Sequence, residues 1–566
     1  MTKERCRCHR NVAAVRLEDG SVYLGWRLRS KDGPGTAFHV ERRLLGGPWT
    51  RATERPVLTC TNWVNPGPVP QGTEYRVVSE TTESEAAVPA PGPLGAGVAL
   101  RSPLRVPGRQ CSAVCAGDLD NDGRTDFVVR STDGDRLLLD AYRGDGRPLW
   151  RLDTHLPARG GWDGSTLHCP FALWDVNGDG RTEVVFHRRP DRVSYPEGFY
   201  AGALAGETLA AADGETGEVI WEAPWPGTRP RVMLTVGHLR ASTVRRLTDH
   251  PELVVRQAHH PEQRRRVEGR GLGEPAAVVV LDETYGDVLL TAVDGRDGST
   301  LWQVRQGRPA GHNLDISDLD GDGAQEVIAG GLCYGGDGTV RWEAEPFGHT
   351  DISKAAPLHP DYPGRQVFYA VESGNPGVYL VDNRGKTIFK EPFHHAHFGW
   401  VARHTTRHAG LQMHAAEDAR RGDRQVPHNP VFLPDGSHWL NLTDWQRKNF
   451  VPVQWDAGPV TVFIVRKEHR LVRLLGTGDV EPVPPGDLPA GGVYGRNLCC
   501  VDILGDYREE VVTIDQERDE LLVLTNTELN DGRGRSPADD FDYRHDRSQH
   551  GSGYYIYKPP PDLRVP

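Results

Sequence analysis

The sequence lacks any run of about 20 consecutive apolar residues, so no segment is expected to span a membrane as a helix. The N-terminal segment, MTKERCRCHRNVAAVRL, carries charges but no apolar core, and a secretory leader is not predicted. We therefore expect a cytoplasmic protein as the sequence is written, and an extracellular one if a leader has been removed. The net charge is −12, which argues against a nucleic-acid partner.

The sequence also has only three methionines and no long amphipathic stretch, whereas it contains 65 glycines and 43 prolines. This composition favours many short strands joined by turns, and predicts an all-β fold. Residues 1–88 alternate apolar and polar positions, as in SVYLGWRL and TEYRVVSE, and predict a small β module. Residues 89–104 are rich in proline and glycine and are interpreted as a linker.

Residues 105–566 contain two alternating signatures. The first is a glycine-rich turn and a strand that ends in tryptophan, as in YRGDGRPLW, DGETGEVIW and DGRDGSTLW; the second is rich in aspartate, as in DLDNDGRTDFVV. Strand-and-turn repeats of roughly 40 to 60 residues are typical of a β-propeller, which we expect this region to form. A basic segment at 245–272 interrupts the repeats and is predicted to be a flexible insertion.

The aspartate-rich signature places oxygen donors at alternate positions of a tight turn, with a glycine after the third donor. Calcium prefers six to eight such oxygens, and strands rather than helices flank each turn, which excludes an EF-hand. The alternative is a solvated acidic turn. Three turns match, and we predict structural calcium at Asp118, Asp120, Asp122 and Asp126, at Asp175, Asn177, Asp179 and Glu183, and at Asp318, Asp320, Asp322 and Glu326. A fourth copy has Leu504 between Asp502 and Asp506 and is predicted to hold no ion.

Histidines gather around these turns. His312 lies just before the third turn, and His168 and His187 lie on either side of the second. One apparent repeat carries a further histidine and two acids, and the stretch HHAHFGWVARH follows it; these residues are His349, Asp351 and Glu372, and then His394, His395, His397 and His404. Such histidines are either ligands and proton carriers or satisfied polar residues of the core.

Taken in order, the motifs VYLGWRL, DAYRGDGRPLW, GHNLDISDLDGDGAQEVIAGG, PGRQVFYAVES and VDILGDYREEVV resemble the rhamnogalacturonan lyases of polysaccharide lyase family 11. The resemblance implies an N-terminal fibronectin-III-like β-sandwich followed by an eight-bladed calcium propeller. It also implies cleavage of rhamnosyl-galacturonate bonds by β-elimination. The active-site cation of the family maps onto His312, His349, Asp351 and Glu372.

Two features depart from the family pattern. Gly399-Trp400 stands where the family has Gly-Arg, so a basic residue expected near the substrate is missing. The C-terminal segment YRHDRSQHGSGYYIYKPPP replaces a tail rich in asparagine and proline.

β-Elimination at a uronate requires that its carboxylate be neutralised, that a base take the C5 proton and that an acid protonate the leaving oxygen. A divalent cation can supply the first function, and a neutral histidine the second. We take His168 and His187 as candidates for base and acid, because their spacing locally resembles propeller-fold ulvan and rhamnose–glucuronate lyases. Arg403 or Arg496 is a candidate clamp for the carboxylate.

Other functions remain open from sequence alone. A non-catalytic calcium propeller that binds carbohydrate would keep the aspartate turns but need no converging histidines. A glycoside hydrolase needs two carboxylates about 5 to 9.5 Å apart, for which Asp351 and Glu372 are the pair to test. The sequence favours a calcium-dependent polysaccharide lyase acting on a rhamnose- and uronate-containing glycan; a lyase of the rhamnose–glucuronate or ulvan type is the nearest alternative. The partner is an acidic polysaccharide, and we expect a monomer.

Overall fold

The computed structural model follows the 566-residue chain. The residues that the structure describes are 6–8, 10–29, 32–33, 35–90, 92–94, 97–157, 169–192, 206–227, 232–239, 275–282, 286, 288–311, 313–417, 428–466, 468–488, 498–529, 534, 536–537, 540–550, 557 and 559–560. The predicted insertion at 245–272 lies outside these residues. None of the helices in the described part is long and apolar enough to cross a membrane.

The N-terminal region forms two β-sheets around one core. The five-stranded sheet has the order β1-β8-β7-β4-β5 and the three-stranded sheet the order β2-β3-β6. Trp26 and Phe38 meet edge to face between them, with ring centroids 5.9 Å apart. The strands are β1 Cys6–Cys8, β2 Ala13–Arg16, β3 Val22–Gly25, β4 His39–Leu44, β5 Thr50–Arg51, β6 Asn62–Asn65, β7 Thr73–Val78 and β8 Thr82–Ser84.

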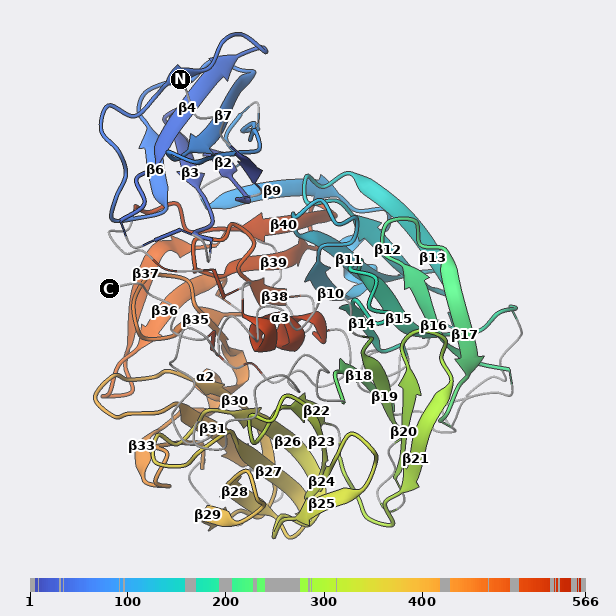
Figure 1. Cartoon of the computed structure of the whole chain (residues 1–566). Coiled ribbons are helices and arrows are strands. Elements are labelled where there is room, and N and C mark those ends of the chain that lie inside the picture. Colours follow the sequence, from blue (N-terminus) through green and yellow to red (C-terminus); the bar gives the residue numbers. More distant parts are fainter. Residues whose placement is uncertain are drawn as a thin grey trace, which may run out of the picture.

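The rest of the described chain forms eight four-stranded antiparallel sheets, which follow one another around a ring (Figure 1). The first four are β10 Cys111–Gly117, β11 Asp126–Asp133, β12 Arg136–Tyr142 and β13 Pro148–Pro157; β14 Phe171–Trp174, β15 Glu183–Arg188, β16 Thr208–Asp213 and β17 Val219–Pro224; β18 Val232–Gly237, β19 Ala277–Asp282, β20 Leu289–Asp294 and β21 Thr300–Arg305; and β22 Leu314–Ser317, β23 Glu326–Ala329, β24 Leu332–Tyr334 and β25 Val340–Glu343.

The fifth to eighth sheets continue this pattern. They are β26 Gly348–Ala356, β27 Gln366–Gly374, β28 Gly377–Val381 and β29 Thr387–Pro392; β30 Ala396–Ala402, β31 Gln412–Glu417, β32 Pro430–Phe432 and β33 His438–Asn441; β34 Phe450–Val453, β35 Val462–Val465, β36 Arg470–Leu474 and β37 Val480–Asp487; and β38 Leu498–Val501, β39 Glu510–Asp515, β40 Glu520–Leu524 and β9 Val98–Pro103. Helices in the described part are short: η1 Gly108–Gln110, α2 Asp444–Asn449 and α3 Phe541–Ser548. The predicted all-β fold is confirmed.

The repeated tryptophan of the sequence joins neighbouring sheets. Trp150, at the outer strand of the first sheet, donates its indole N–H to the carbonyl of Gly214 in the second sheet, at 2.7 Å. Trp221 donates in the same way to Gly295 of the third sheet, at 2.8 Å. The ring of Trp150 also covers Gly217, where a Cβ would approach the ring within 2.8 Å. The glycine-rich turns of the second and third sheets therefore each receive the tryptophan of the preceding sheet, which explains why the two recur together.

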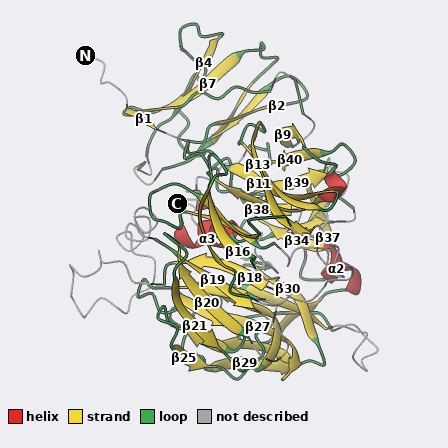
Figure 2. Cartoon of the chain, turned by 90° about the vertical axis from the view of Figure 1, so that its right-hand side faces the viewer, coloured by secondary structure: helices red, strands yellow, loops and turns green. Residues whose placement is uncertain are grey.

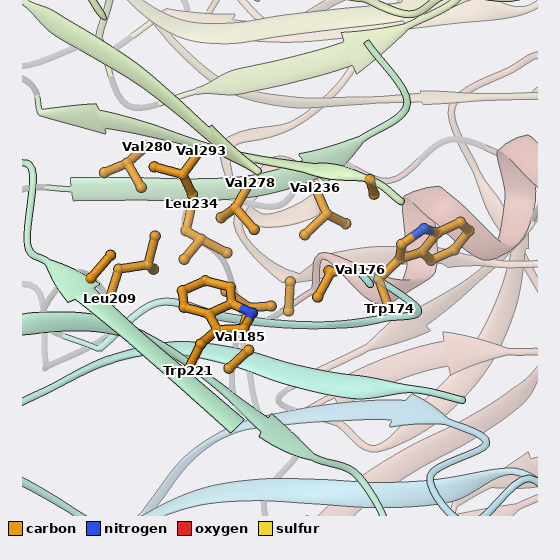
Figure 3. Close-up of a cluster of buried hydrophobic side chains, with 14 of the residues drawn as sticks. Trp174, Val176, Val185, Leu209, Trp221, Leu234, Val236, Val278, Val280 and Val293 are labelled. Carbon is orange, nitrogen blue, oxygen red and sulfur yellow. The ribbon is translucent and has the colours of Figure 1, made fainter. Parts of the chain in front are cut away.

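Apolar side chains fill the space between adjacent sheets. Figure 3 shows one such layer between the second and third sheets, where Val185 and Trp221 face Leu234 and Val278. These side chains are at least nine-tenths buried. Burial of this kind on both faces of each sheet is the main stabilising contribution to the ring.

The prediction that residues 89–104 form a linker is wrong for residues 98–103. They form β9, which pairs with β40 and completes the eighth sheet (Figure 2). Arg101 on β9 forms an ion pair with Glu520 on β40, at 2.7 Å. The proline and glycine content of the preceding residues obscured this strand, and its partner lies far along the chain.

Residues 543–548 of the C-terminal segment that departs from the family pattern belong to α3, which lies at the centre of the ring (Figure 1). Phe541 joins the apolar layer of Trp174, with ring centroids 5.5 Å apart. Asp546 accepts from the ammonium of Lys354 on β26 at 2.5 Å, and Arg547 pairs with Glu509 at 2.6 Å. The helix is thus tied by charge to sheets on different sides of the ring.

Candidate functional site

The fifth sheet brings three predicted ligands together. His349 and Asp351 lie on β26, and Glu372 lies on β27. The Nε2 atom of His349 is 3.2 Å from Oε2 of Glu372 and 3.6 Å from Oδ1 of Asp351. His349 is 1% exposed and Asp351 is 8% exposed, so the charges of this cluster are largely shielded from solvent.

Irregular pairing between β26 and β27 places these side chains on one side. His349 pairs with Ser373 and Thr350 pairs with Val371, so Glu372 has no partner in the register. A second shift follows between Thr350 and Ile352 and leaves Asp351 out of the pairing. β-Bulges of this kind redirect side chains and are common next to functional sites.

The sixth sheet adds His395 and His397, which the motifs did not predict as ligands of the cation. Nε2 of His395 is 3.0 Å from Oε1 of Glu372, and Nδ1 of His397 forms an ion pair with Asp351. His397 lies on β30 and His395 immediately precedes it, and β30 contacts β26 and β27. The His-x-His spacing was a usable signal, because alternate residues of a strand face the same side.

The fourth predicted ligand, His312, lies outside the described residues. The residue before it, Gly311, forms a parallel bridge with Thr350 on β26. A Cβ at Gly311 would lie 1.9 Å from the carbonyl oxygen of Thr350, so only glycine permits this approach of the two backbones.

The donor atoms of the cluster fit a divalent cation. His349, Asp351 and Glu372 offer ligand atoms within 4.8 Å of one another, and so do Glu372, His395 and His397. Among the described residues, Oδ1 of Asp351 is buried and receives no hydrogen bond. Asp351 is buried and Glu372 is 16% exposed, and two such neighbouring carboxylates repel each other unless a positive charge lies between them. This set is therefore better satisfied with a cation than without one.

The three aspartate turns connect the first and second strands of their sheets. In each, the first aspartate accepts a hydrogen bond at 3.0 Å from the N–H of the glycine five residues later: Gly123, Gly180 and Gly323. Burial raises the pKa of the last donor of each turn, to about 7 for Asp126, about 8 for Glu183 and about 7 for Glu326. These all-oxygen sets fit calcium, which would offset the cost of burying their charges.

The fourth copy contains a positive side chain of its own. The Nε of Arg508 donates to Oδ2 of Asp506 at 3.1 Å, and both residues are buried. The hydroxyl of Tyr23, on β3 of the N-terminal region, donates to the same carboxylate at 3.0 Å. Tyr507 has a φ of 63° at the position that glycine occupies in the other three turns. This turn therefore joins the N-terminal region to the ring through a guanidinium.

His187 lies near the end of β15, whereas Glu183 in the second aspartate turn begins that strand. The side chain is 7% exposed, and its Nε2 is 2.8 Å from Oε2 of Glu207. Its ring stacks on Trp225 with centroids 3.7 Å apart. His187 lies near the end of the second strand of the second sheet, as Glu372 does in the fifth sheet. The other proposed proton carrier, His168, lies outside the described residues.

Of the two candidate arginines, Arg403 lies in the described part and is not beside the cluster. Arg403 follows β30, and six residues of strand, about 20 Å, separate it from His397. Its backbone N–H donates to Thr461 at 3.0 Å. Arg403 therefore lies at the opposite end of the strand from the cluster, and its role as a carboxylate clamp stays a prediction. Arg496 lies outside the described residues.

Trp400 is a core residue. It is 5% exposed and contacts the ring of His414, with centroids 4.3 Å apart. Its indole N–H donates to Nε2 of His404 at 3.2 Å. The side chain that replaces the family arginine therefore packs between the sixth and seventh sheets and leaves the cluster without a basic group from this position.

Burial of His404 and His414 predicts acid sensitivity. Burial lowers the pKa of each imidazole to about 3, from an ordinary 6.5. Below about pH 6.5 the unfolded chain therefore binds protons that the folded chain excludes, and the free energy of unfolding falls as the pH falls. We expect a loss of about 2 kcal/mol per histidine between pH 7 and pH 5.

Denaturant unfolding at the two pH values measures this loss. The double variant His404→Gln, His414→Gln is expected to lose less stability over the same interval than the parent chain. An unchanged pH dependence in the double variant would contradict this explanation.

Comparisons with known proteins agree with this architecture. Residues 284–431 match the family model of the rhamnogalacturonan lyase family 11 C-terminal domain, and residues 107–186 match an FG-GAP-like repeat. The chain is 24% identical to rhamnogalacturonan exolyase YesX of Bacillus subtilis (92% of this chain, 89% of the relative). It is also 24% identical to rhamnogalacturonan endolyase YesW of the same organism (92% and 84%).

Solved structures share the fold over the whole chain. The exotype rhamnogalacturonan lyase YesX superposes with a TM-score of 0.74 at 19% identity, covering 100% of this chain and 98% of that one. A Bacillus licheniformis rhamnogalacturonan lyase gives 0.72 at 20% identity, covering 100% and 97%. The chain is therefore similar over nearly its whole length to the rhamnogalacturonan lyases of polysaccharide lyase family 11, as its motifs predicted.

Proposed function

We propose that this protein is a polysaccharide lyase that cleaves a rhamnose- and uronate-containing glycan, similar to rhamnogalacturonan, by β-elimination. The product would carry an unsaturated uronate. One observation carries the proposal: histidines and carboxylates from β26, β27 and β30 converge in a chain similar to rhamnogalacturonan lyases over 92% of its length.

The same proposal extends to the architecture. The eight sheets would form an eight-bladed β-propeller, which β9 closes, over residues 105–566 together with 98–103. Residues 1–88 would form a fibronectin-III-like β-sandwich. Calcium at the three aspartate turns would hold the strand connections on the side away from the histidine cluster, since the turns precede the second strands and Glu372 lies near the end of one.

In the elimination, the cluster would hold a divalent cation. Its ligands would be His349, Asp351, Glu372 and His395. When bound, such a cation neutralises the substrate carboxylate and makes the adjacent C5 proton more acidic. The chain's own side chains would orient the uronate there. The shielding of His349 and Asp351 from water strengthens every electrostatic interaction at this position.

His187 is our proposed proton carrier. Glu207 contacts its Nε2 and would hold the imidazole in one orientation. Stacking on Trp225 fixes the plane of the ring. His168 is the proposed partner from the sequence.

The geometry favours a lyase over two alternatives. A carbohydrate-binding module would not require histidines and carboxylates to converge. In a glycoside hydrolase two carboxylates flank the bond, whereas Asp351 and Glu372 both face His349. Lyases of the rhamnose–glucuronate and ulvan types act on other polymers, so the polymer that is cleaved distinguishes them from a rhamnogalacturonan lyase.

Ultraviolet absorbance tests the proposal directly. We expect the absorbance of the unsaturated product to rise with rhamnogalacturonan, more than with ulvan or gum arabic, and a chelator to abolish the rise. Metal analysis of the purified protein identifies the cations that are held. Reducing ends released without the absorbance would indicate hydrolysis, and retention of polymer without any product would indicate a binding module.

A further inference from the structure

Phe398 is an exposed aromatic residue at the edge of the histidine cluster. Its side chain is 52% exposed. It follows His397 on β30, and the two rings meet edge to face with centroids 4.0 Å apart. Because His397 pairs with Asp351, the ring of Phe398 lies on the solvent side of the cluster.

The other exposed aromatic side chains in the described part also have neighbours, as Phe398 has His397. Arg308 lies over Phe347, at 5.3 Å from the ring centroid. The remaining two have ring partners on their own local segments: Tyr362 with His359 at 4.8 Å, and Trp445 with Phe450 at 5.8 Å. Single exposed apolar residues are common on protein surfaces, so exposure alone does not distinguish Phe398.

The backbone of Phe398 provides a second observation. Its φ is 46°, in the left-handed region that bulky residues rarely adopt. The register of β30 and β31 shifts between His397 and Gly399, and a Cβ at Gly399 would lie 2.0 Å from the carbonyl oxygen of His414. β30 is therefore pressed against β31 at Gly399, and Phe398 is pushed outward. Backbone strain of this kind is concentrated at functional sites.

We infer that Phe398 is a stacking platform for the neutral 6-deoxyhexose that adjoins the uronate at the cluster; this inference rests on the proposed function. A pyranose ring presents a face of C–H groups, and a 6-deoxy sugar adds an apolar methyl group. An aromatic ring that covers both removes apolar surface from water, which favours binding. The uronate carboxylate would instead bind at the charged cluster beside the ring. Because the two sugars alternate along the polymer, the deoxy sugar would lie on Phe398 when the uronate lies at the cluster.

The experiment compares Phe398→Gly with Phe398→Tyr. Glycine accepts the positive φ without strain and removes the ring, and tyrosine keeps the ring. Leu45→Gly is the matched control, because Leu45 is 80% exposed, has a φ of 48° and lies in the N-terminal region. Retention in gels that contain rhamnogalacturonan or polygalacturonate, the KM and kcat for elimination, and the unfolding midpoint are measured for each chain.

We expect Phe398→Gly to weaken retention by rhamnogalacturonan and to raise KM, each about tenfold, with kcat little changed. Its unfolding midpoint should equal or exceed that of the parent chain, which a merely structural role would not allow. Retention by polygalacturonate, which lacks the deoxy sugar, should be the same with and without the ring. Phe398→Tyr and Leu45→Gly should match the parent chain.

The retention assay separates this inference from the lyase proposal. If the parent chain eliminates no polymer, the lyase proposal fails, while a loss of rhamnogalacturonan retention in Phe398→Gly still supports the platform. Unchanged retention in Phe398→Gly overturns the inference even where elimination is observed. An equal loss on both polymers, or no retention of the parent chain on rhamnogalacturonan, overturns it as well.

Discussion

Replacing His349 by alanine is expected to lower kcat/KM for elimination by about 10²- to 10³-fold, the range typical for losing one group that stabilises developing charge. The change removes an imidazole that contacts both Asp351 and Glu372. The two carboxylates then lie in a largely shielded position without the imidazole. The site also loses one cation ligand, so its affinity for a cation falls. Absorbance kinetics measure the rate, and calorimetric titration measures cation binding.

His359→Ala is the matched control for this variant. His359 lies in the turn that joins β26 to β27, at the opposite end of the same pair of strands, where its Nδ1 accepts from the N–H of Asp361 at 3.2 Å. It should leave rate and cation binding unchanged. Retention of both properties in His349→Ala would contradict the proposed cation site.

His187→Ala separates proton transfer from cation binding. The proposed proton carrier is on the second sheet, so its removal should lower kcat while cation binding at the cluster stays that of the parent chain. A loss of cation binding in His187→Ala would contradict this division of roles.

Replacing Arg508 by methionine is expected to lower the free energy of unfolding by about 3 to 5 kcal/mol, the range measured when one partner of a buried ion pair is removed. Asp506 would remain buried without its guanidinium, and the contact with Tyr23 of the N-terminal region would weaken. Denaturant unfolding in calcium and in chelator measures the loss. The loss should be the same in both, because this turn uses an arginine where the other three offer oxygen ligands.

Two further variants test the cause. Arg518→Met removes an arginine that is 59% exposed and pairs with Asp515 at 2.9 Å, and it should cost much less stability than Arg508→Met. Adding Asp506→Asn to Arg508→Met removes the uncompensated charge and should restore much of the stability. A double variant as unstable as Arg508→Met would assign the loss to packing rather than to charge.

The features that the sequence predicted well are local. An aspartate turn or a glycine-rich turn with its tryptophan is contained within one hairpin, so the residue pattern and the structure coincide. His349 and Asp351 are likewise close in sequence and lie on the same strand. Three of the four predicted cation ligands lie in the described part, and the structure brings these three together.

The features that the sequence did not predict depend on contacts between sheets or on broken alternation. His395 and His397 join the cluster because the sixth sheet packs beside the fifth. The bulge in β30 changes which residues face inward, so Trp400 is buried and Phe398 is exposed. Arg403 is close to the histidines in sequence but belongs to the other end of the strand. β9 was missed because nothing near it in the sequence indicates its partner.

Closure of the eighth sheet by β9 has a consequence for biosynthesis. Arg101 and Glu520 are 419 residues apart, so β9, the first strand of the ring in chain order, waits for almost the entire ring to be translated before it can pair. Until then the nascent chain presents an unpaired strand edge at each end, the kind of edge that promotes aggregation and exchange between chains. Ring closure is a contact of high sequence separation, which makes it an expected slow step of folding. Once translation ends, β9 pairs with β40 and the ring closes.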